Sequence, residues 1–286
     1  MQRFGTSAIP THYTGWLLLK GDWEGAVHSI IRMKAGEGEE SEKGRRVWFE
    51  EKNGKKALDL MPRRMVAERA IIGWLSKKNC ERDYLGALSQ IPKNLRTMYV
   101  HAYQSYIWNS IVSERIKMFG AQKVVTGDLV KIDNKENNDD IREVKEGEEN
   151  NYTIFDVVMT LPGKDVIYPK GKLKEKYEEM LRMDGLEIDK LWRAQRDFSM
   201  EGSYRKMIHL PKEVKWEIIK YKGEDEPLMR SKEDELIGLE EYYDKSMNNE
   251  KEDKLGIKLE FNLGSSAYAT MAIREVLKGE EKRIHS

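Results

Sequence analysis

A strictly alternating segment near the end of the chain limits the folds that it can adopt. In LGIKLEFNL (255–263), an apolar side chain occupies every second position. Because successive side chains of a strand point to opposite faces, this pattern predicts a β-strand with one apolar face. The loop Gly264–Ser266 follows, and AYATMAIREVLK (267–278) has the pattern of a helix that ends at Gly279. Strand and helix must therefore combine in one fold.

Upstream, helices come first and strands later, which indicates an α+β fold. Gly21 and Gly120 are expected to end helices, and the polar segment GEGEESEKGRR (36–46) is expected to be a linker. The predicted helices begin near Thr11, Asp22, Pro62 and Thr97, and the clearest of them runs from Met98 to Gly120. Strands are predicted at 124–125, at 155–161, between the Pro162-Gly163 turn and Pro169, and at 213–221.

The charge is zero overall but unevenly distributed. The stretch 131–150 holds eight acidic and four basic residues, and the stretch 221–254 holds twelve and six. Removing both from the fifty basic and fifty acidic residues of the chain leaves forty basic and thirty acidic. We therefore expect two solvated acidic loops on a moderately basic body, which suits a polyanionic partner.

Several classes of protein are excluded or made improbable by missing patterns. The single cysteine, Cys80, excludes an intramolecular disulfide and a cysteine-rich zinc site, and the five histidines lack metal-ligand spacing. The sequence contains no G-x-S-x-G, P-loop or G-x-G-x-x-G motif and no apolar run long enough for a membrane span. We expect an intracellular, soluble protein and not an NTP-using or dinucleotide-binding enzyme.

The aromatic and basic segments each allow two interpretations. Tyr99, Tyr103 and Tyr106 share a helix face, either as core residues with polar partners or as a base-stacking platform. Ser265 and Ser266 precede a helix, where they suit either a phosphate or a plain N-cap.

The segment RAQRDFSMEGSYRKMIHL (193–210) interleaves cations with Phe198 and Tyr204. It suits either an RNA strand or an ordinary charged surface. Asp165 beside Lys164 suits a turn better than a catalytic site.

Taken in order, the segments resemble the TruD family of pseudouridine synthases, most closely its eukaryotic branch. The resemblance extends from Met1 to about Lys278. QRFG at Gln2–Gly5 matches the end of the family's N-x-x-G-x-Q-R-F-G motif, and residues 261–275 match its Phe-x-Leu, Tyr-Ala-Thr and Arg-Glu elements. Between them lie HAYQSYIWN, VTGDLV, LPGKDVIYP and GSYRK, in the family's order.

The resemblance implies a mixed-sheet catalytic domain, incomplete at its N-terminus, with an inserted α/β TruD domain. The implied division is 1–96 and 255–286 for the catalytic domain and 97–254 for the insertion. The implied walls of the uridine pocket are Gln2, Arg3, Phe4, Gly5, Phe261, Leu263, Ser265, Ser266 and Tyr268. The implied RNA-binding residues are Arg193, Arg196, Tyr204, Arg205 and Lys206.

For the whole enzyme, the resemblance implies isomerisation of uridine to pseudouridine in the D-arm region of tRNA and in other RNAs. The base is flipped into a pocket, an aspartate acts on the ribosyl unit, and no metal or cofactor takes part. A monomeric enzyme in the nucleus or cytoplasm is expected.

The family's catalytic aspartate, in a Gly-x-Lys-Asp motif, precedes QRFG and is therefore expected upstream of Met1. Gly163-Lys164-Asp165 imitates this motif but lies in a separate Pro-Gly-x-Asp-Val-x-Tyr-Pro segment, so Asp165 is expected to be structural. Gly264 stands where the family has proline. The alternatives are a non-catalytic RNA-binding protein and a half-enzyme that needs a separate N-terminal polypeptide.

Overall fold

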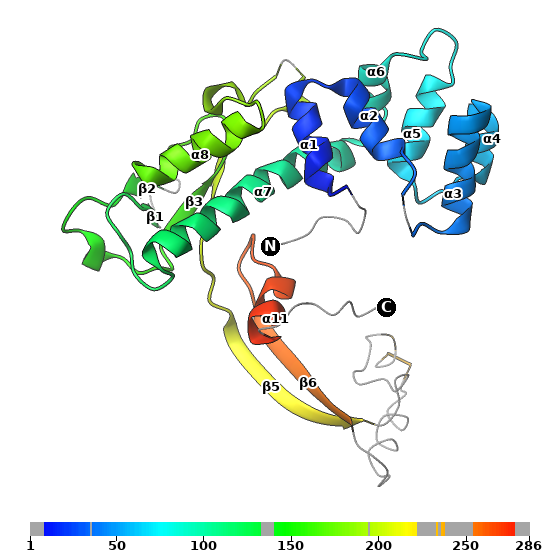
Figure 1. Cartoon of the computed structure of the whole chain (residues 1–286). Coiled ribbons are helices and arrows are strands. Elements are labelled where there is room, and N and C mark those ends of the chain that lie inside the picture. Colours follow the sequence, from blue (N-terminus) through cyan, green and yellow to red (C-terminus); the bar gives the residue numbers. More distant parts are fainter. Residues whose placement is uncertain are drawn as a thin grey trace. The chain divides into compact units, whose positions relative to one another are not determined.

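Helices occupy the first part of the chain and strands begin only at residue 129, as the sequence predicts for an α+β fold (Figure 1). The computed structural model describes residues 9–34, 36–132, 140–193, 195–221 and 254–277, together with Glu233, Leu236 and Ile237. The chain divides into unit 1, residues 1–208, and unit 2, residues 209–286. The predicted three-segment domain division stays a prediction.

The helices of unit 1 follow local stop and cap signals. They are α1 (Thr11–Lys20), α2 (Trp23–Ile31), α3 (Glu39–Arg46), the π-helical turn η1 (Val47–Glu51), α4 (Gly54–Leu60), α5 (Val66–Leu75), α6 (Tyr84–Ser89) and α7 (Lys93–Phe119). Gly21 ends α1 in the left-handed conformation, with φ of 76°, and the Asp22 side chain caps α2 by accepting from the Gly25 N–H at 2.8 Å. Both predictions are confirmed, as is the end of α7 at Gly120.

The predicted start of α1 at Thr11 is confirmed, although Pro10 and not Thr11 is its N-cap, whereas the starts predicted at Pro62 and Thr97 are wrong. Pro10 and Pro92 stand immediately before α1 and α7, because proline supplies a suitable φ but no N–H. Thr97 consequently lies inside α7, where its hydroxyl donates to the Lys93 carbonyl at 3.0 Å. Pro62 forms a turn closed by the Met65 N–H, and α5 begins only after it.

Helix α7 is the central element of unit 1. It contacts α1, the helix α8 (Lys172–Met183) and the strand β3 (Val157–Leu161) (Figure 1). The crossing with α1 is very close at Gly15, where a Cβ atom would lie 2.0 Å from the Tyr99 carbonyl oxygen. Only glycine permits this approach, so α1 is fixed against α7 at one point.

The expected polar linker at 36–46 is wrong, because its second part forms α3. Acidic residues fill the first turn of α3 and basic residues its last turn, in the order that the helix dipole favours. The helix places Arg45 in the interior of unit 1, with none of its side chain exposed.

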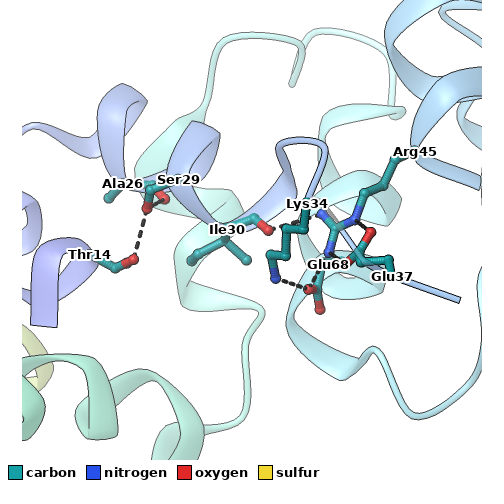
Figure 2. Close-up of polar contacts among 8 residues, drawn as sticks. All are labelled: Thr14, Ala26, Ser29, Ile30, Lys34, Glu37, Arg45 and Glu68. Atoms are coloured by element: carbon teal, nitrogen blue, oxygen red, sulfur yellow. Dashed lines mark hydrogen bonds and ion pairs between the residues drawn. The ribbon is translucent and has the colours of Figure 1, made fainter. Parts of the chain in front are cut away.

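Arg45 belongs to a cluster of four charged side chains (Figure 2). Its guanidinium donates to both carboxylate oxygens of Glu37 at 2.8 and 3.0 Å, and to Glu68 at 2.8 Å. It also donates to the Ile30 carbonyl at 3.0 Å, while Lys34 reaches Glu68 at 3.2 Å. The cluster links the segment after α2 to α3 and α5, with two positive and two negative charges.

Four antiparallel strands form the sheet of unit 1 in the order β2-β1-β3-β4. They are β1 (Leu129–Ile132), β2 (Asp140–Glu143), β3 (Val157–Leu161) and β4 (Ser203–Lys206). β3 is entirely buried, as the apolar run at 155–161 predicts. Trp108 of α7 donates to the Met159 carbonyl at 3.1 Å, and Tyr177 of α8 (Lys172–Met183) donates to the Thr160 carbonyl at 2.7 Å.

Two predicted strands are absent from the described part of unit 1. Val124 and Val125 precede a tight turn, in which Asp128 accepts from the Val125 N–H, so the strand begins later, at Leu129. Between Pro162 and Pro169 the chain is irregular and makes a single bridge, Lys164 to Glu201. Part of the stretch 131–150, expected to be loop, pairs as β1 and β2.

The described part of unit 2 contains a two-stranded antiparallel sheet and a helix. β5 (Lys212–Tyr221) and β6 (Lys254–Asn262) pair antiparallel with Ile218 opposite Ile257, and α11 spans Ala269–Leu277 (Figure 1). All three elements agree with the sequence patterns. On the predicted apolar face, Leu255, Ile257 and, at 67%, Trp216 are exposed, whereas Leu259 and Phe261 are half-buried.

The Arg45 cluster predicts a large difference between two neighbouring arginines. Arg45→Ala leaves buried carboxylates without their main partner and should cost about 3–5 kcal/mol of unfolding free energy. Arg46→Ala removes an exposed pair with Glu42 and should cost less than about 1 kcal/mol. Urea unfolding of both variants measures this, and similar losses would contradict the description of the cluster.

Candidate nucleic-acid interface

The connection from α8 to β4 carries two of the predicted RNA-binding residues, Arg193 and Arg196, and β4 carries the other three. It contains the 3-10 turns η3 (Ile188–Lys190) and η4 (Arg196–Phe198). The Met200 N–H donates to the Leu191 carbonyl at 3.0 Å, which closes a loop over these residues. Asp197 holds η4 to α7 by accepting from Arg96 Nε at 3.0 Å. The connection is thus fastened to the helical core rather than free.

Arg193 is one of the fastening residues. Its Nε donates to the Leu19 carbonyl at 2.5 Å, and its guanidinium lies 5.9 Å from the centre of the Trp23 ring. Partial burial lowers the pKa of this guanidinium. The guanidinium also lies close to Gly21, where a Cβ would be 2.9 Å from Nη1. Arg193 therefore has a structural role whether or not it contacts RNA.

Phe198 and Tyr204 are the two aromatic residues of this segment singled out by the sequence analysis, and neither is fully exposed to solvent. Phe198 is buried and packs 5.3 Å from Trp23. Tyr204, on β4, is half-buried, and its hydroxyl accepts from the Ile167 N–H at 2.6 Å. The exposed aromatic is Trp192, at 60%, which the sequence interpretation missed. A lone tryptophan between Leu191 and Arg193 in a highly charged segment was the available signal.

The remaining predicted cations lie on η4 and β4. Arg196 is exposed, whereas Arg205 and Lys206 are half-buried. The Arg205 guanidinium lies 5.3 Å from the centre of the Trp108 ring, within the range of a cation–π contact. The structure thus brings the predicted RNA-binding residues together on one closed loop and the adjoining edge strand. Their role in binding stays a prediction.

The tyrosines of α7 agree with the interpretation as core residues with polar partners. Tyr103 is buried and donates to Asp184 Oδ2 at 2.6 Å, while Tyr106 stacks on His12 with ring centres 4.4 Å apart. Burial, and then the bond to Asp184, raises the pKa of Tyr103. Burial also raises the pKa of Tyr99. These tyrosines fasten α7 to its neighbours, so a stacking platform on this face is not supported.

The predicted pocket residues fall into two groups. Gln2, Arg3, Phe4 and Gly5 lie outside the described residues, so their expected proximity to Tyr268 stays a prediction. In unit 2, Phe261 and Leu263 are half-buried and Ser265, Ser266 and Tyr268 are exposed around the turn before α11.

Within that turn, Ser266 has a positive φ of 64°, which serine rarely adopts. The Ala267 N–H donates to the Gly264 carbonyl at 3.3 Å, and α11 starts at Ala269. The turn therefore separates both serines from the first helical residue.

Asp165 has the properties of a turn residue. Its side chain is 79% exposed, its φ is 57°, and Lys164 Nζ lies 3.4 Å from its carboxylate. Gln104 of α7 fixes the base of this turn by donating to the carbonyls of Pro162 and Glu201, both at 2.8 Å. The exposed carboxylate agrees with the structural interpretation of Asp165.

Neither a metal centre nor a membrane helix is found in the described part of the chain. No group of three or more histidine, cysteine, aspartate or glutamate side chains there has the geometry to hold a metal ion. None of the described helices is long and apolar enough to cross a bilayer.

Comparison with known proteins identifies the family. The family model for tRNA pseudouridine synthase D (TruD) matches residues 1–276. This chain belongs to the TruD family. Over 283 residues it is 40% identical to the human pseudouridylate synthase 7 homolog, covering 97% of this chain and 40% of that protein. It is 36% identical to the multisubstrate pseudouridine synthase 7 of Schizosaccharomyces pombe, covering 97% of this chain and 44% of the relative.

A solved structure has the same fold. The crystal structure of a TruD protein from Methanosarcina mazei matches with a TM-score of 0.66 and 25% identity, over 94% of this chain and 57% of that one. The expectation of a TruD-type α+β fold is thereby confirmed. The chain spans less than half the length of the curated TruD relatives described above.

The two arginines of the closed loop should differ in their effect on stability. Arg193→Ala removes a charged donor from the Leu19 carbonyl and should cost about 1–3 kcal/mol of unfolding free energy. Arg196→Ala changes an exposed side chain and should stay within about 0.5 kcal/mol. Urea unfolding tests this, and equal effects would remove the structural role given to Arg193.

Tyr103 should make the protein sensitive to alkali. Its pKa is raised in the folded state, so its contribution is complete below the unfolded pKa of about 10 and is lost as the pH rises further. We expect Tyr103→Phe to be less stable near neutral pH but to lose stability less steeply above pH about 10. Unfolding free energies measured from pH 8 to 11 give the slope of stability against pH. Tyr13→Phe, at an exposed position, is the control. Identical slopes for the parent and both variants would contradict the role given to the buried Tyr103 hydroxyl.

Proposed function

We propose that this chain forms the RNA-binding and pocket-lining part of a pseudouridine synthase that isomerises uridine in RNA. The observation that carries the proposal is the family match over residues 1–276, together with two pseudouridine synthases that align over 97% of the chain. Transfer RNA in its D-arm region is the proposed main substrate. The name of the multisubstrate fission-yeast relative supports further RNA targets.

In the proposed reaction, the target uridine leaves its stack and enters a pocket. The residues Gln2, Arg3, Phe4, Gly5, Phe261, Leu263, Ser265, Ser266 and Tyr268 form its walls. Arg193, Arg196, Tyr204, Arg205 and Lys206 bind the RNA strand. A carboxylate from a segment outside these 286 residues acts on the ribosyl unit, the uracil rotates, and a carbon–carbon glycosidic bond replaces the nitrogen–carbon bond.

The division of the chain is part of this proposal. Residues 1–96 and 255–286 contribute to a catalytic domain, and 97–254 form the TruD insertion. The exposed apolar side chains of β5 and β6 support a larger sheet, because an isolated two-stranded hairpin is at best marginally stable in water. We further propose a monomeric protein of the nucleus or cytoplasm.

The test separates binding from turnover. The chain alone should bind a transfer RNA transcript in a salt-dependent manner. It should release no tritium from tritiated uridine, because the proposed reacting carboxylate is not among its residues. Fusing the segment that precedes the aligned region in the fission-yeast relative should restore tritium release. The same fusion with its Gly-x-Lys-Asp aspartate changed to alanine is the matched control.

Three results would change the proposal. Turnover by the chain alone would mean that a carboxylate within it reacts, with Asp165→Ala the first variant to make. RNA binding without turnover in the correctly folded fusion would favour a non-catalytic RNA-binding protein. Restoration by the upstream segment added as a separate polypeptide would instead support a half-enzyme.

A further inference from the structure

Trp192 is exposed although both of its neighbours are held in the structure. Leu191 is only 3% exposed, and its carbonyl accepts the Met200 N–H. The Arg193 N–H donates to Ser199 Oγ at 2.8 Å, and the Arg193 side chain is bonded to the Leu19 carbonyl. With the residues on either side fixed, the 60% exposure of the indole results from the backbone geometry and not from a loose loop.

An indole held in this way suits a stacked base. Tryptophan is highly buried on average, so a large exposed ring calls for an explanation. Its rigid display reduces the entropy lost when a flat ligand binds, because the supporting backbone is already ordered. Aromatic rings on a basic surface are the usual platform for unpaired bases of RNA.

The polar surroundings of Trp192 favour RNA over a protein partner. Arg196 is exposed on the same closed loop. Lys190, two positions before Trp192, pairs with Glu187 at 2.8 Å, and the neighbouring Asp189 is also exposed. A protein-docking surface would have a contiguous apolar patch. Here Glu187, Lys190, Gln195 and Arg196 make the loop polar around a single exposed ring.

We propose that Trp192 stacks on an unpaired base of the RNA substrate, with Arg196 contacting an adjacent phosphate. This inference rests on the proposed RNA substrate and assigns a residue that the sequence motifs did not. The base that stacks here need not be the reacting uridine, since binding of a flanking nucleotide orients the strand equally well.

The test uses the 286-residue chain and fluorescence anisotropy with labelled oligouridine, a blunt RNA duplex and a transfer RNA transcript. Trp192→Ala should weaken binding of oligouridine by about fivefold to a hundredfold, the range of base–aromatic stacking. Its effect on the duplex should be small, because paired bases offer no free face within the helix. Trp192→Phe should stay within about threefold of the parent because it keeps a ring.

Two variants distinguish stacking from general apolar contact and from charge. Trp192→Leu keeps apolar bulk without a ring and should bind oligouridine as weakly as Trp192→Ala. Neither Trp192 variant should change the slope of the logarithm of the binding constant against the logarithm of the salt concentration. Arg196→Ala should reduce the magnitude of that slope by about 1. Met183→Ala, which removes another exposed apolar side chain of unit 1, is the control and should bind as the parent does.

The outcomes separate this inference from the proposed function. Absence of RNA binding by the folded parent chain would overturn the RNA substrate itself. Normal RNA binding by Trp192→Ala would overturn only the role of Trp192. Equal losses on oligouridine and duplex, or full binding by Trp192→Leu, would overturn stacking. Thermal melting of each variant confirms that it is folded, which an exposed position should allow.

Discussion

The close crossing of α1 and α7 is the contact on which unit 1 depends. At Gly15 the two backbones approach so closely that any side chain would collide with the Tyr99 carbonyl. Around this point the hydroxyl of Tyr103 and the indole N–H of Trp16 both donate to Asp184, the residue that follows α8. One backbone approach therefore fixes α1 against α7, and α8 follows through polar bonds. The connection to β4 starts from this fixed position.

Buried arginines then join segments whose sequences look polar. Arg45 and Arg115 have no exposed side-chain surface, and Arg115 pairs with the equally buried Asp128 at 2.7 Å. Such pairs add little net stability over an apolar alternative, but losing one partner is costly because the other charge stays buried. They therefore favour one arrangement of the chain over others. Periodicity cannot reveal them, since it treats every arginine as a surface residue.

Sequence reasoning succeeded where the signal was local. The alternation in β5 and β6 and the glycine stops at Gly21 and Gly120 concern a few neighbouring residues, and the structure agrees with them. It failed where tertiary contacts decide. Residues 36–46 became partly helical because Arg45 gains buried partners, and Val124 and Val125 gave way to a turn centred on Asp128.

The same distinction applies to the candidate site. The order of motifs pointed to the family, but the exposure of side chains in and beside residues 193–210 could not be read from residue type. Phe198 is apolar and packs inside against Trp23, whereas Trp192 is equally apolar and lies outside. What separates them is the bonding of their neighbours, because Leu191 and Arg193 turn inward and leave Trp192 no position in the core. The chemistry of this surface therefore depends on side chains that hold the backbone. Replacing Arg193 would displace Trp192 as well as remove a proposed RNA contact.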